Sequence, residues 1–99
     1  MRRVYKICVI INAIRFNEVI IDPHFELKHS KAVSDDIILL LIKELDGMYL
    51  EPDGIDSGGF KYFVTEPMFY KNKPYRLVWL IDLYASYIGI LNCFRRPKK

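Results

Sequence analysis

The sequence is short of the residues that metal and disulfide sites use. It has two cysteines and two histidines in 99 residues, and their spacing matches no zinc pattern. We therefore expect no metal and no cofactor. Cys8 and Cys93 both lie inside apolar runs, which predicts buried free thiols in a reducing compartment. The sequence also lacks a Gly-rich phosphate loop, a nucleophile elbow and paired catalytic carboxylates, so it contains no self-sufficient catalytic signature.

Long apolar segments are missing as well. No run approaches the ~18 residues that suggest a transmembrane helix. The first apolar run is interrupted by Lys6 and Asn12 and has no cleavage site of small residues, which argues against a signal peptide. We therefore expect a single domain over residues 1–99 in the cytoplasm. Apolar residues still make up 52% of the chain, which excludes general disorder and predicts apolar surface for a partner.

Charge is unevenly distributed, although the net charge is only +3. Residues 35–56 carry one lysine and seven acidic residues, whereas residues 57–99 carry eight Lys and Arg and two acidic residues. This segregation favours a positive surface for phosphates, unless the acidic block is merely a solvated helix and loop. The last five residues, Arg95–Lys99, hold four cations, which suit a phosphate backbone. The alternative for Lys98 and Lys99 is a solubilising tail.

Residue patterns predict an α+β fold, in which a small antiparallel β-sheet packs against one main α-helix over about residues 35–46. Ser34 suits an N-cap, apolar residues from Ile37 to Leu45 recur at helical spacing, and Gly47 suits a stop. Strands are expected at residues 4–11, 15–22, 60–70, 75–82 and 87–94, with a loop at 51–59. Both faces of the last hairpin are apolar, and one helix can cover only one face. The other face needs the N-terminal segment or a partner.

Two groups of residues could carry chemistry. His29 lies beside Lys28, and a nearby cation favours the neutral imidazole that can accept a proton from a 2′-hydroxyl. The same cation can stabilise negative charge at phosphorus during RNA cleavage. Between Lys61 and Arg76, aromatic residues alternate with cations, a pattern typical of base stacking beside phosphate contacts. The alternatives are a loop histidine without a role and aromatic residues that only build the core.

Short motifs are spread over residues 21–96. They are Asp22-Pro23, Lys28-His29, Ser34-Asp35-Asp36, Arg76-Leu77-Val78 and the run from Ile88 to Arg96. In this order they resemble the BrnT toxins, a branch of the RelE-like ribonuclease toxins of bacterial toxin–antitoxin modules. The chain departs from the family pattern at Ser30, where glycine is usual. It also departs at Gly89, where the last strand commonly carries a cation.

The resemblance implies a toxin-like endoribonuclease, an mRNA interferase that cuts RNA without a metal. By matched position, His29 would be the general acid or base, and Lys28 and Arg95 would bind or neutralise the phosphate. The candidate substrate-binding residues are Arg76, Arg96, Tyr75 and Lys73, and Arg76 is also a candidate structural residue. The expected partners are RNA and a cognate antitoxin protein, or a second copy of the chain.

A competing hypothesis is a non-catalytic protein-interaction domain. It is favoured by the apolar excess, by the two apolar faces of the last hairpin and by the absence of a cation at Gly89. The two hypotheses differ in what the surface must offer. The first requires exposed cations around a phosphate site, and the second requires exposed apolar surface.

Overall fold

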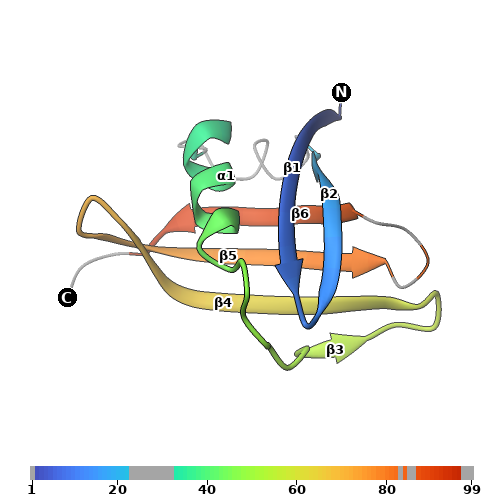
Figure 1. Cartoon of the computed structure of the whole chain (residues 1–99). Helices are drawn as coiled ribbons and strands as arrows, with labels where there is room; N and C mark the ends of the chain where they lie inside the picture. Colours follow the sequence, from blue (N-terminus) through green and yellow to red (C-terminus); the bar gives the residue numbers. More distant parts are fainter. Residues whose placement is uncertain (1, 23–32, 83, 85–86, 97–99) are drawn as a thin grey trace.

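The computed structural model describes residues 2–22, 33–82, 84 and 87–96. Within these ranges the chain forms one helix and a six-stranded sheet of order β1-β2-β6-β5-β4-β3 (Figure 1). The strands are β1 (Arg3–Ile11), β2 (Ile14–Ile21), β3 (Gly54–Ile55), β4 (Phe60–Tyr70), β5 (Lys73–Asp82) and β6 (Tyr87–Arg95). The helix is α1 (Asp35–Lys43). Most strand bounds lie within two residues of those expected, and β3 lies inside the expected loop.

The expected fold class is wrong. Of the residues that the structure describes, 60% lie in strands, and the sheet curls into a half-barrel rather than packing against one main helix. The helix is only nine residues long and ends at Lys43, while Gly47 lies beyond it with φ +83°. The reason for the curl is the β1–β2 hairpin, which joins the sheet through a parallel pairing of β2 with β6. In Figure 1 this hairpin crosses in front of β4, β5 and β6 and does most of the covering.

The core lies inside the curl of the sheet, where buried residues of the β1–β2 hairpin and of α1 meet those of the other strands. Along β5, Tyr75, Leu77, Trp79 and Ile81 are all buried, and they alternate with half-buried residues on the outer face. Trp79 stacks on Phe63 of β4 with ring centroids 4.2 Å apart. From α1 and the turn after it, the buried residues are Ile38, Leu41, Ile42 and Leu45. The strict alternation of β5 therefore decides which of its side chains can reach a ligand.

Cys8 departs from the expected burial, whereas Cys93 follows it. β1 alternates without interruption, so Cys8 lies on the same exposed side as Val4, Lys6 and Ile10. Cys93 is buried on the inner face. Burial raises the pKa of the Cys93 thiol to about 12.

The outer face carries a continuous cross-strand row. Val4, Ile20, Gly89, Leu80 and Tyr62 pair in turn across β1, β2, β6, β5 and β4. A Cβ atom at Gly89 would lie 2.9 Å from Cδ1 of Leu80, so Leu80 packs directly over the glycine. The space that a larger side chain would need at position 89 is already filled.

Candidate nucleic-acid interface

Three of the predicted site residues, Lys73, Arg95 and Arg96, lie together where β6 ends beside the β4–β5 turn. Arg95 pairs with Tyr75, and the Arg96 N–H donates a hydrogen bond of 2.9 Å to the Pro74 carbonyl. Lys73 begins β5 next to Pro74. The turn itself is Lys71-Asn72, and both residues have positive φ, as a tight two-residue hairpin requires. The C-terminal end of β6 is thereby held against the turn that carries the two lysines.

We call this surface the basic end, and it consists of Phe69, Lys71, Lys73, Arg95 and Arg96. Lys71, Lys73 and Arg95 are exposed, and the Lys71 ammonium lies 5.5 Å from the centre of the Tyr70 ring. Phe69 pairs with Pro74 on the outer face and is 62% exposed, whereas Lys73 and Arg95 pair with Tyr70 and Tyr75 on the inner face. A nucleic acid that passes around this end can stack a base on the ring while its phosphates contact the cations.

Glu66 is the residue of this region that sequence reasoning missed. It lies where the pairing of β4 with β5 shifts between Thr65 and Met68, next to Pro67, which has no N–H to give to a ladder. Its Oε2 atom lies 2.7 Å from Nε of Arg76 without the alignment of a hydrogen bond, so this contact is ionic. Its Oε1 atom lies 3.8 Å from Nε of Arg96. The signal in the sequence was an acid directly before a proline inside a strand.

The predicted cations differ in whether they contact the Glu66 carboxylate. Arg76 and Arg96 are half-exposed and share its carboxylate, and the Arg76 guanidinium lies 5.8 Å from the centre of the Phe94 ring. This placement agrees with the structural role considered for Arg76. Lys73 and Arg95 are exposed, so a phosphate can approach them with less competition from a carboxylate.

The remaining predicted residues stand apart from this surface. Tyr75 is only 6% exposed and belongs to the core, so its ring face is closed to a base. Lys28 and His29 lie outside the described residues. Gly89 is buried under Leu80 on the outer face.

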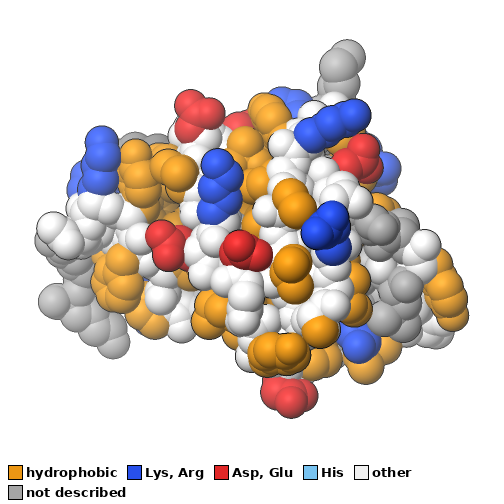
Figure 2. Space-filling model, viewed as in Figure 1, with side chains coloured by type: hydrophobic (Ala, Val, Ile, Leu, Met, Phe, Trp, Pro, Cys, Tyr) orange, Lys and Arg blue, Asp and Glu red, His pale blue; other side chains and the backbone are white. Residues whose placement is uncertain are grey.

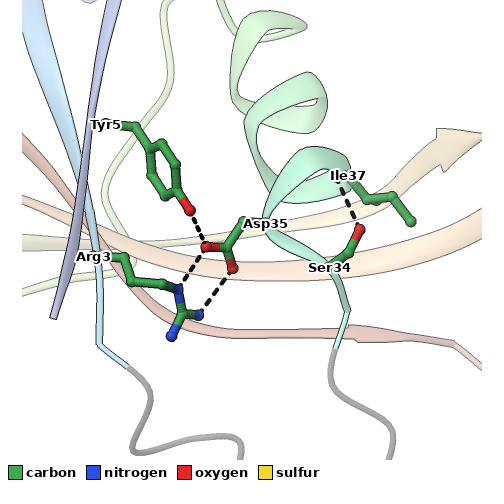
Figure 3. A network of polar contacts seen from close by, with 5 residues as sticks. All are labelled: Arg3, Tyr5, Ser34, Asp35 and Ile37. Carbon is green, nitrogen blue, oxygen red and sulfur yellow. Dashed lines mark hydrogen bonds and ion pairs between the residues drawn. The ribbon is translucent and has the colours of Figure 1, made fainter. Parts of the chain in front are cut away.

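A second polar network joins β1 to α1 (Figure 3). Arg3 donates to both carboxylate oxygens of Asp35, from Nε at 2.5 Å and from Nη2 at 2.9 Å, and the Tyr5 hydroxyl donates to the same carboxylate. The hydrogen bonds from Arg3 lower the pKa of Asp35 against the opposing effect of burial. The bond to Asp35 raises the pKa of Tyr5. The positive charge of Arg3 balances the negative charge of Asp35. We therefore assign this network a structural role, in which it holds α1 against β1.

Acidic residues of the 35–56 block accept hydrogen bonds from other parts of the chain. Asp56 Oδ1 accepts hydrogen bonds from the N–H groups of Gly58 and Phe60, and Oδ2 accepts one from the Tyr62 hydroxyl. These hydrogen bonds lower the pKa of the Asp56 carboxyl, and the bond from the Tyr62 hydroxyl contributes most. Asp53 accepts from the Val64 N–H. Among the described residues, no group of three or more His, Cys, Asp or Glu side chains could hold a metal ion.

Comparisons with known proteins found no match to a family model, a curated protein or a solved structure. In the part of the chain that the structure describes, no helix is both long and apolar enough to cross a membrane.

Proposed function

We propose that this protein binds single-stranded RNA through the basic end. The observation that carries the proposal is that exposed Lys71, Lys73 and Arg95 and the exposed ring of Phe69 all lie at the same end of the sheet, at the β4–β5 turn. Figure 2 shows acidic side chains near α1 and others toward the right and lower edges of this face, with Lys and Arg side chains between them. At the β4–β5 turn itself, Lys71 and Lys73 are exposed, so their charges are open to phosphates. A single strand suits the site better than a duplex because a duplex keeps its bases stacked and closed to an aromatic ring.

Cleavage of the bound RNA is the second step of the proposal, and it follows from the resemblance to BrnT toxins. It requires His29 and Lys28 to reach a phosphate held by Arg95. His29 would take the proton of a 2′-hydroxyl, the 2′-oxygen would attack phosphorus, and the 5′-oxygen of the next nucleotide would leave. The cations would stabilise the charge on the phosphorus oxygens.

Binding can be tested with a fluorescent single-stranded RNA of mixed sequence, measured by anisotropy at several salt concentrations. Each phosphate contact contributes about −0.7 to the slope of log K against log salt for single strands. Arg95→Gln and Lys73→Gln should each weaken binding and reduce that slope by about this amount. Lys43→Gln is the matched control, because it removes an exposed cation from the last turn of α1. Equal losses in Lys43→Gln and Arg95→Gln would contradict a site at the basic end.

Stacking and cleavage have separate readouts. Phe69→Ala should weaken binding about tenfold or more without changing the salt slope, since a stacked base contributes about 1–3 kcal/mol. Cleavage should persist in EDTA and disappear in His29→Ala, which should still bind RNA. A wild-type protein that binds RNA without cutting it would remove the cleavage step and leave the binding proposal intact. Absence of binding would remove both.

A further inference from the structure

The outer face of the sheet contains a groove of about 160 Å³ where β2, β6, β5 and β4 meet. Ile20, Leu80 and Gly89 are among its lining residues. Gly89 contributes no side chain to the groove, and the Leu80 side chain packed against Gly89 forms part of its wall. A cavity of about 150 Å³ can hold a benzene molecule. The groove is therefore large enough for one large apolar side chain.

An apolar side chain of this kind lies at the edge of the groove. Leu91 lines it and is 41% exposed. The pairing of β5 with β6 shifts register beside it, between Val78 and Trp79, so Leu91 falls in a bulge and has no cross-strand partner there. The chain thus exposes a leucine next to a hole that can accept a leucine. Such a pair on one surface is self-complementary under a two-fold axis.

The charges beside the groove are self-complementary as well. Arg2 and Asp22 both line it, and Nε of Arg2 lies 3.8 Å from Oδ2 of Asp22. Their side chains are 71% and 38% exposed. A two-fold axis through this region brings each arginine toward an aspartate of the other copy, so charges of opposite sign meet.

We propose that a second copy of this chain occupies the groove and forms a two-fold symmetric dimer. Each Leu91 fills the groove of the other copy, and each Arg2 faces Asp22 of the other copy. None of the residues of the basic end lines the groove. Dimer formation is therefore separable from RNA binding, and the two proposals can fail independently.

Sedimentation velocity of the purified protein, from about 1 µM to about 100 µM, tests this proposal. Wild type should show a concentration-dependent shift from monomer to dimer. Leu91→Lys should raise the dimer dissociation constant about 100-fold, because a symmetric interface loses two anchors and each costs about tenfold. Ile14→Lys is the control, since Ile14 is 45% exposed and lies at the β1–β2 turn, outside the groove. Circular dichroism should show that both variants are folded.

Charge reversal gives an independent test of the interface. Arg2→Glu and Asp22→Arg should each weaken the dimer, and the double variant should restore it, because attraction returns only when both signs are reversed. An exposed pair of this kind contributes little to the monomer's own stability. A wild type that stays monomeric throughout, equal effects of Leu91→Lys and Ile14→Lys, or a double variant weaker than either single variant would overturn the proposal.

Discussion

The contact between β1 and α1 gives the sharpest test of the structure. Asp35 and Asp36 both lie in the first turn of α1, so Asp35→Asn and Asp36→Asn remove the same charge from the same helix end. Only Asp35 accepts hydrogen bonds from Arg3 and Tyr5, whereas Asp36 is exposed. The difference between the two variants therefore isolates the network from the interaction with the helix dipole.

The expected magnitudes differ clearly. Loss of a carboxylate near a helix N-terminus costs about 0.5 kcal/mol, which is the whole effect expected for Asp36→Asn. Hydrogen bonds to charged groups contribute about 1.5–3 kcal/mol each. The Asp35 side chain is 19% exposed and that of Arg3 is 32% exposed, so water screens the pair only in part. We expect Asp35→Asn to lower the free energy of unfolding by about 3 kcal/mol and Tm by about 12 °C or more.

The effect should also depend on pH. The pKa of Asp35 is lower in the folded protein than its ordinary value, so its contribution is fully present above the unfolded value of ~3.9. It is lost as pH falls through the folded value. The pKa of Tyr5 is raised, so the stability that it contributes is present below the unfolded value of ~10 and is lost as pH rises through the folded value.

Urea unfolding of wild type and both variants between about pH 3 and pH 8 measures these effects. The gap between wild type and Asp35→Asn should be constant near neutral pH and shrink in acid. Costs for Asp35→Asn and Asp36→Asn that agree within about 0.5 kcal/mol would refute the reasoning. A gap that persists undiminished in acid would refute the charge-based part of it.

Two further predictions concern the two faces of the sheet. Gly89→Ala should destabilise the protein by about 1–3 kcal/mol, because its Cβ would lie 2.9 Å from Leu80 Cδ1. In urea unfolding, the same substitution should cost less in a Leu80→Ala background than in wild type. Equal costs in the two backgrounds would contradict the contact. In native protein at about pH 8, a thiol reagent should label Cys8 rapidly and Cys93 only after denaturation. The reason is that Cys8 is exposed, whereas Cys93 is buried with its pKa raised to about 12. Labelling is followed by mass spectrometry with Cys8→Ser as the control, and fast labelling of that variant would contradict the burial of Cys93.

Local patterns predicted the individual elements well. The aromatic-rich run predicted a strand at residues 60–70, and β4 has these bounds. Ser34 was identified as the N-cap, and its side chain accepts from the Ile37 N–H at 3.4 Å. These features depend on residues close together in the sequence, so their physical causes are visible there.

Irregularities of pairing are harder to predict, because a bulge depends on the partner strand as well as on the strand itself. The shift in β4 brings Glu66 to Arg76 and Arg96. The shift in the pairing of β5 with β6 leaves Leu91 without a cross-strand partner.

The sequence by itself determined where most strands and the helix begin, and that cations are concentrated toward its C-terminal end. Only the tertiary structure decided that β2 pairs in parallel with β6, that the sheet curls into a half-barrel, and that Tyr75 is enclosed while Lys73 and Arg95 remain exposed. The physical reason is distance along the chain. Strand formation and capping depend on near neighbours, whereas sheet order and burial depend on contacts between segments tens of residues apart.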